Sequence, residues 1–210
     1  MARQTAISIN TIPIGPLGII GMPGCEELTD KIDKYLVKWR KTQASEHAES
    51  IAFFGYQRDT YKIDVSIPRF GSGEGKGVIN ESVRGYDIYI VCDVFNYSCS
   101  YDMYGRKVYM SPDDHFADLK RVISALCSKP KRVSVIMPML YEGRQHKRSS
   151  RESLDCAMAL KELVHLGVEN IITFDAHDQR VQNAIPDKSF ENVMPTYQMI
   201  KALVNNVDDL

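Results

Sequence analysis

The sequence has no long apolar segment of the kind that directs a chain to a membrane or across one. Residues 1–20, MARQTAISINTIPIGPLGII, lack the unbroken apolar core of a signal peptide, and no stretch approaches the roughly 20 apolar residues of a spanning helix. From these absences we expect a cytoplasmic protein that has no membrane partner.

Patterned cysteines are absent as well. None of the five cysteines forms a C-x-x-C pair or has a histidine partner at the spacing of a zinc site. Cys92, Cys127 and Cys156 lie in apolar stretches, where cysteine is more often a core side chain than a ligand or a nucleophile. We therefore expect these three side chains to fill the core.

The chain also lacks an excess of charge. Its 26 Lys and Arg residues nearly balance its 27 Asp and Glu residues, which gives a formal net charge of −1 at pH 7. Without a global positive field, nucleic acid is not an expected partner. A nucleic-acid-binding module that uses one local basic loop is an alternative that this balance disfavours.

Repeats and low-complexity tracts are absent too, and 210 residues with 44% hydrophobic content can bury one sizeable core. Short apolar runs predict strands at 17–20, 51–56, 61–70, 88–94, 133–140, 168–174 and 190–193. Helical spacing predicts a helix whose buried residues are Leu28, Ile32, Tyr35, Leu36 and Trp39. Ser111 and Pro112 start another, with Phe116, Leu119, Ile123 and Leu126 buried, and a last helix starts at Thr196. This alternation predicts an α/β fold with a doubly wound, mainly parallel sheet flanked by helices, whereas 95–107 reads as a polar connection.

A basic loop follows the strand at 133–140. It contains Arg144, His146, Lys147, Arg148 and Arg151, with Gln145 as a neutral donor. The loop lies just past the carboxyl end of a predicted parallel strand, where open α/β sheets bind ligands, so its cations suit a polyphosphate. The alternative is that the loop is a solvated surface, which is the commoner role of a basic run.

The next helix and strand lead to a short polar motif. Ser149 and Glu152 have capping-box spacing, and Cys156, Leu160, Leu163 and Val164 then fall on one helical face that Gly167 ends. The following strand ends at Asp175 and His177. In an extended chain these two side chains project to the same side, about 7 Å apart, and could hold a metal ion or carry a proton.

Four glycines, at positions 71, 73, 75 and 77, break the chain directly after Phe70. Composition alone favours a flexible hairpin loop there.

Several of these stretches, in this order, resemble the N-terminal half of ribose-phosphate pyrophosphokinase. PMLYEGRQHKR, a helix and IITFDAHDQRVQ are similar to the family's Tyr-Ala-Arg-Gln-Asp-Arg/Lys loop and its strand that ends in Asp-Leu-His. RFGSGEGKGVINESVRGYDIYIV resembles its Arg-Phe-Ser-Asp-Gly-Glu segment and its Glu-Ser-Val-Arg-Gly lead into a strand. The resemblance runs from about Ile19 to Val204 and depends on the order of several motifs.

The resemblance implies a phosphoribosyltransferase-like fold with a small β-hairpin elaboration. It makes residues 1–15 an N-terminal extension and residues 16–210 the ATP-binding domain. The family's acidic pair and Thr/Gly-rich loop, which cradle ribose 5-phosphate, have no counterpart, so the C-terminal domain is expected to be absent. The whole enzyme would transfer the diphosphoryl group of Mg·ATP to ribose 5-phosphate, giving AMP and phosphoribosyl pyrophosphate, and the isolated chain is expected to be inactive.

The resemblance also assigns roles to residues, none of them catalytic. Arg144, Gln145 and Lys147 would hold the triphosphate, and Asp175 and His177 would position Mg²⁺. Phe70 and Glu74 match a loop that reaches the ATP of a neighbouring subunit, which implies a homo-oligomer. Ser72 and His146 each stand where the family has Asp. These departures leave open the alternative of a non-catalytic regulatory or scaffold relative.

Overall fold

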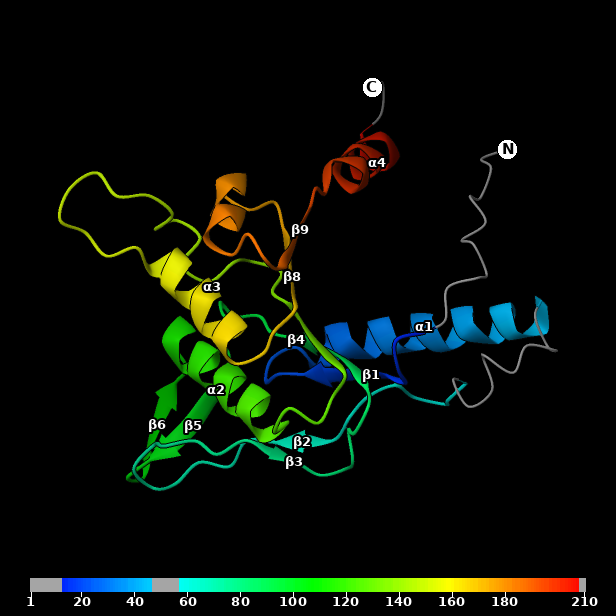
Figure 1. The fold of residues 1–210 in the computed structure, drawn as a ribbon, viewed down its shortest axis with the longest axis horizontal. Coiled ribbons are helices and arrows are strands. Elements are labelled where there is room, and N and C mark those ends of the chain that lie inside the picture. The colour runs from blue at the N-terminus through cyan, green and yellow to red at the C-terminus, as the bar shows by residue number, and fades with distance from the viewer. Residues whose placement is uncertain (1–12, 47–56, 208–210) are drawn as a thin grey trace.

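A five-stranded sheet forms the centre of the protein. The computed structural model describes residues 13–46 and 57–207. All neighbouring strands of the sheet are parallel, in the order β1-β4-β7-β8-β9 (Figure 1). Their bounds are β1 Leu17–Gly21, β4 Asp87–Val91, β7 Arg132–Ile136, β8 Asn170–Phe174 and β9 Ser189–Val193. The predicted α/β class and parallel sheet are confirmed.

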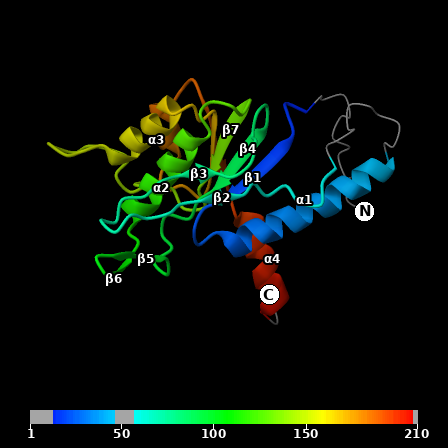
Figure 2. The ribbon, with the colours of Figure 1, turned by 90° about the horizontal axis from the view of Figure 1, so that it is seen from below.

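Helices cover both faces of this sheet. α2 (Pro112–Ala125) and α3 (Asp155–His165) lie together on one side and α1 (Glu26–Glu46) lies on the other (Figure 2). The larger core joins Leu119 of α2 and Leu163 of α3 to strand residues such as Ile90, and a smaller cluster under α1 contains Ile19 and Val91. The two clusters take alternate strand residues, because successive side chains of a strand point to opposite faces.

The predicted buried face of α1 is right in part: Ile32 and Leu36 pack against the smaller core cluster, but the other three predicted residues do not. Leu28, Tyr35 and Trp39 are 40%, 68% and 37% exposed, so Trp39 is not a core residue, whereas Thr29 and Asp33 are buried. The Asp33 carboxylate accepts a 2.7 Å hydrogen bond from the Tyr61 backbone N–H. The inner position of the helix therefore holds a polar side chain, because the segment beside β1 needs an acceptor there.

Residues 61–70 do not form the predicted long strand. β2 is Val65–Ser66, paired antiparallel with β3 (Val78–Ile79), and the rest of the segment makes isolated bridges. Pro68 lies in this segment and has no backbone N–H for a continuous ladder. The strand predicted at 51–56 lies outside the described residues.

A hairpin occupies much of the predicted polar connection at 95–107. β5 (Ser100–Met103) pairs with β6 (Arg106–Tyr109) through Tyr104 and Gly105, whose φ angles are 49° and 75°. Positive φ at both central positions is typical of the tight turns that join antiparallel strands. The signal was weak because tyrosine stands where asparagine or aspartate is usual.

Helix α2 begins as predicted. Ser111 caps it in a complete capping box with Asp114, and Pro112 is its first residue. The predicted buried residues of this helix are all 5% exposed or less. Cys92 and Cys156 are buried as expected, but Cys127, at φ 52° just past the helix end, is exposed.

Strand β7 and helix α3 leave a longer loop between them than predicted. β7 ends at Ile136, not near Leu140, and α3 begins at Asp155, not at Ser149. Half of the predicted capping box forms, a 3.3 Å bond from the Ser149 N–H to Glu152, but without the return contact it starts no helix. The end of α3 before Gly167, which has a φ of 95°, is confirmed.

Beyond β8 the chain contributes Val181 and Ile185 to the core, at 6% and 2% exposure. A 3₁₀ helix, η2 (Gln179–Ala184), precedes β9, and α4 (Thr196–Asn206) follows it with no buried residue. None of the helices described is long and apolar enough to cross a membrane.

Candidate functional site

A cavity of about 600 Å³ opens at the carboxyl edge of the sheet. Its walls come from the carboxyl ends of three adjacent strands: Phe95 after β4, residues 139–144 after β7, and residues 174–177, which begin with the last residue of β8. Pro112 at the start of α2 completes them. Open parallel sheets bind ligands at this edge, because loops from neighbouring strands converge there.

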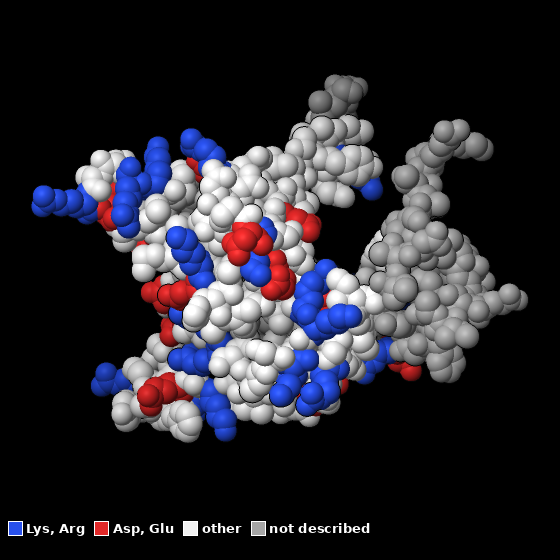
Figure 3. Space-filling view, viewed as in Figure 1, with Lys and Arg blue, Asp and Glu red and all other residues white. Residues whose placement is uncertain are grey.

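Of the predicted phosphate-binding residues, Arg144 alone lines this cavity. Its side chain is exposed, and within residues 13–46 and 57–207 it forms no ion pair. Gln145 instead donates from its side-chain amide to the Ser153 carbonyl, at 2.8 Å, and so stabilises the loop. Lys147 is exposed, and Lys and Arg side chains of the loop that precedes α3 project into solvent (Figure 3).

Asp175 and His177 both line the cavity, but the chain does not present them as predicted. Asp175 has a φ of 47°, so the backbone leaves the extended conformation at the end of β8. The prediction that Asp175 and His177 project to the same side of an extended strand is therefore wrong. The described ranges contain no group of three or more His, Cys, Asp or Glu that could hold a metal ion.

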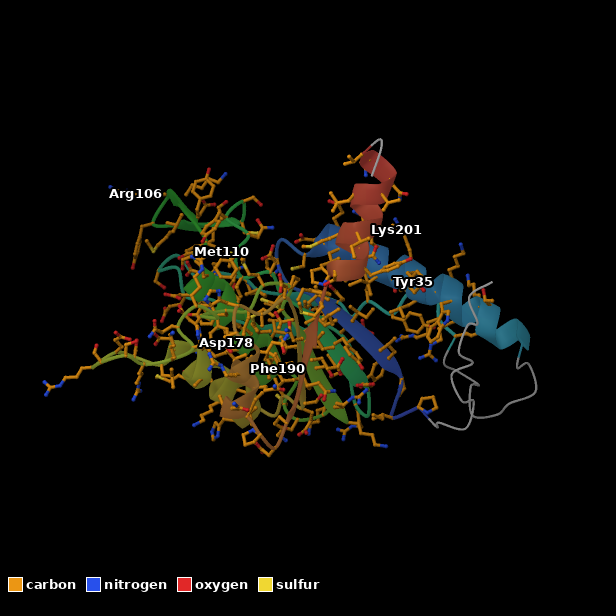
Figure 4. All side chains as sticks on the ribbon, turned by 90° about the horizontal axis from the view of Figure 1, so that it is seen from above. Tyr35, Arg106, Met110, Asp178, Phe190 and Lys201 are labelled. Carbon is orange, nitrogen blue, oxygen red and sulfur yellow. The ribbon has the colours of Figure 1, made fainter. Side chains whose placement is uncertain are left out.

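A contact that the sequence did not suggest joins the basic loop to this motif. His146 Nε2 lies 3.2 Å from Asp178 Oδ2, and the His146 and His177 rings meet edge to face with centroids 5.2 Å apart. Asp178 lies near the base of the extended basic loop (Figure 4). The sequence did show that His146 follows one predicted strand and Asp178 the next. Their spacing along the chain could not predict that the two side chains meet.

The wall of the cavity near α2 is acidic. The Tyr141 hydroxyl donates to Asp113 at 2.6 Å, and burial together with this bond raises the pKa of Tyr141. Glu142 lines the cavity, and burial first, then the charges of Asp155 and Asp113, raise the pKa of its carboxyl group. Phe116 stacks on the Tyr141 ring at 4.3 Å, so this wall is held by the core of α2.

The glycine-rich loop is packed on the protein rather than free. Arg69 at its start bonds the buried Asp118 of α2, and its guanidinium lies 4.3 Å from the centre of the Tyr101 ring in β5. A Cβ on Gly75 would stand 3.0 Å from Asp118, so only glycine fits comfortably there. The predicted hairpin is confirmed, because β2 pairs antiparallel with β3 and Arg69 bridges Gly75, and the contacts of these two residues hold the hairpin against α2.

Phe70 and Glu74, the loop residues predicted to reach the ATP of a neighbouring subunit, do not lie at the cavity. Phe70 is 57% exposed, and its N–H donates to the Glu74 carbonyl at 2.8 Å. The Glu74 carboxylate accepts from the Ser72 hydroxyl, also at 2.8 Å. Neither Phe70 nor Glu74 lines the cavity of the same chain.

Comparison with known proteins agrees with this architecture. Residues 17–167 match the family model described as the N-terminal domain of ribose phosphate pyrophosphokinase. This match includes the basic loop but ends before Asp175.

Curated relatives extend the similarity. Ribose-phosphate pyrophosphokinase 1 of Schizosaccharomyces pombe is 27% identical over 165 residues, which cover 78% of this chain and 37% of the relative. Ribose-phosphate pyrophosphokinase of Vibrio cholerae is 25% identical over 150 residues, covering 70% of this chain and 43% of the relative. The chain thus spans less than half the length of these relatives.

The fold is similar to that of a crystal structure of phosphoribosylpyrophosphate synthetase from Mycobacterium smegmatis. The TM-score is 0.66 with 18% identity, and the match covers 90% of this chain and 52% of the other. Because the family model matches well over half of the sequence, this chain belongs to the ribose phosphate pyrophosphokinase N-terminal-domain family.

Proposed function

We propose that this chain is the ATP-binding part of a ribose-phosphate pyrophosphokinase. One observation carries the proposal: Arg144, a cation with no ion pair among the described residues, shares a cavity with Asp175 and His177 at the ligand-binding edge of a parallel sheet. Transfer of a diphosphoryl group depends on positioning and on neutralising phosphate charge rather than on a protein nucleophile. Arg144 would bind the phosphates, and the exposed Lys147 would need to move inward to join it.

The donor set at the cavity fits a magnesium ion that arrives with the nucleotide. Asp175 supplies one carboxylate and His177 one imidazole, and no third protein ligand accompanies them among the described residues. Mg²⁺ takes oxygen ligands and commonly uses one or two carboxylates together with substrate phosphates and waters. Asp175 therefore suits a site completed by ATP, and His177 would hold the ion through one of its waters. When bound, the ion would neutralise charge on the phosphates.

A calorimetric titration with Mg·ATP tests the role of Arg144. Replacing Arg144 by Ala should remove a charge-assisted contact worth about 1.5–3 kcal/mol, which weakens binding roughly tenfold to 150-fold. Arg148→Ala is the matched control, because Arg148 lies in the same loop, is exposed and does not line the cavity. Equal losses in the two variants, or none in Arg144→Ala, would show that the loop acts only as a diffuse positive surface.

We further propose that Phe70 and Glu74 serve a neighbouring subunit, because both lie outside the cavity and Phe70 is 57% exposed. The protein would then be a homo-oligomer, with a symmetric dimer as the smallest assembly. Sedimentation that finds only the 23.8 kDa monomer would contradict this proposal.

A second candidate is a non-catalytic regulatory or scaffold relative. It is favoured by Ser72 and His146, which stand at positions of expected carboxylates and are both engaged in contacts within the chain. Under either candidate we expect the chain alone to make no phosphoribosyl pyrophosphate, because the 210 residues offer no counterpart of the loop that the resemblance assigns to ribose 5-phosphate. Supplying a ribose-5-phosphate domain, fused or in trans, separates the two: turnover supports the enzyme, and ATP binding without turnover supports the regulatory relative.

A further inference from the structure

The side chain of His146 is turned inward in a loop that otherwise faces solvent. It is 12% exposed and its partner Asp178 is 13% exposed, whereas Arg144, Lys147 and Arg148 are exposed. His146 Nε2 lies 3.2 Å from Asp178 Oδ2, at ion-pair distance from a carboxylate that can only accept. Nδ1 lies 3.2 Å from the Arg144 carbonyl oxygen, which ties the ring to the backbone of the predicted phosphate-binding residue.

Asp178 is itself held in place. One of its oxygens accepts from the Arg180 backbone N–H at 2.9 Å and caps η2. The Arg180 side chain also donates to both carboxylate oxygens, and these bonds hold the pKa of Asp178 well below its usual range. The carboxylate is therefore an ordered, ionised acceptor next to His177.

The contact is the link between two parts of the proposed site. Residues 137–154 separate β7 from α3; the Cys156 backbone N–H donates to the Gln145 carbonyl, whereas residues 147–151 are exposed. In the part of the chain that the structure describes, no other hydrogen bond or ion pair joins residues 144–152 to residues 175–184. Gln145 and Ser153 bond within the loop and do not reach the motif after β8.

We propose that His146 and Asp178 are positioning residues that fasten the basic loop to the motif after β8, so that Arg144 faces His177 across one nucleotide-binding cavity. The inference rests on the proposed function for its ligand. It gives His146 a role at the position where the resemblance predicted a carboxylate. The pair would act through Arg144 and His177, without touching the substrate.

The sign of the effect separates positioning from simple electrostatics. Removing the negative charge of Asp178 near a polyphosphate would by itself strengthen binding. A positioning role predicts the opposite sign, weaker binding by Asp178→Asn. If the unfastened loop is competent in about one molecule in ten, the apparent Kd for Mg·ATP rises about tenfold.

The experiment compares His146→Ala, Asp178→Asn and the double variant with the parent chain. Calorimetry with Mg·ATP should show a loss of about tenfold in each single variant, and the double variant should lose no more than either, because one contact is removed in all three. His146→Gln, which keeps an N–H donor at similar reach, should recover part of the affinity. His165→Ala at the exposed end of α3 and Asp187→Asn at an exposed turn are matched controls expected to bind as the parent.

Hydrogen exchange of the ligand-free variants supplies a readout that does not depend on ATP. Exchange should quicken in peptides covering 144–152 and stay unchanged in β7 and β8, which also shows that the variants fold. Unchanged exchange in the loop would overturn the positioning role, as would tighter ATP binding by Asp178→Asn. If the parent binds no Mg·ATP while loop exchange still quickens, the proposed function fails and the fastening contact stands.

Discussion

The buried carboxylate of Asp118 holds the glycine-rich loop against α2, and its removal should loosen that loop. Asp118 is 2% exposed and accepts from Arg69 at 2.5 Å and from Arg121 at 2.6 Å, whose side chains are 11% and 32% exposed. Arg69 also donates to the Gly73 carbonyl at 3.1 Å. Replacing Asp118 by Ala leaves the less exposed arginine, Arg69, without its counter-ion.

The expected loss of unfolding free energy follows from how exposed these side chains are. Breaking a buried ion pair by removing one partner typically costs about 3–5 kcal/mol. Arg121 can return to water and Arg69 keeps the Gly73 carbonyl, so we expect about 2–4 kcal/mol for Asp118→Ala, or roughly 5–15 °C in Tm for a chain of this size. Burial raises the pKa of Asp118 even with both arginines in contact, so desolvation offsets much of the pair's contribution. Replacing both partners, as in Asp118→Leu with Arg69→Met, should therefore restore most of the lost stability.

Urea denaturation at neutral pH measures the unfolding free energies, with Asp102→Ala on the exposed face of β5 as the control. Hydrogen exchange at the Phe70 and Gly73 amides, which bond within the loop, should quicken in Asp118→Ala. A loss below about 0.5 kcal/mol, or a double variant as unstable as the sum of its parts, would refute the reasoning.

Two other predictions concern single residues near the site. Burial and the neighbouring carboxylates raise the pKa of Glu142 in the folded protein. Ionised Glu142 therefore destabilises the native state when the pH is above the pKa that this residue has in the unfolded chain. The penalty disappears as the pH falls below that value. Glu142→Gln should therefore raise Tm at neutral pH and not near pH 3.5, and an equal gain at both would contradict the charge argument. Ser111→Ala removes the capping box of α2 and should lower the unfolding free energy by about 0.5–2 kcal/mol in urea titrations; Ser124→Ala near the end of that helix should cost less.

Much of the architecture could be predicted from short stretches of sequence. Strands such as β4 and β8 are apolar runs bounded by polar residues, and α2 carries its own start signal in Ser111 and Pro112. Both signals are local, because a capping box and a hydrophobic period involve residues only a few positions apart. The topology then follows, since parallel strands joined by crossover helices bring the ends of β7 and β8 to one edge of the sheet.

The remaining features depended on groups far apart in the chain. The Asp33 side chain of α1 is buried and accepts a hydrogen bond from the Tyr61 backbone N–H, a contact between residues far apart in the chain. Helix α3 begins at Asp155 and not at Ser149, where only one of the two capping-box contacts forms. The basic composition of the loop placed cations near the sheet edge, but only tertiary contacts turned His146 inward to Asp178. The spacing of residues along a chain specifies which of them can lie on one face of a helix or strand. A polar side chain is buried on that face only where a partner satisfies its hydrogen bonds, and the folded structure brings that partner close.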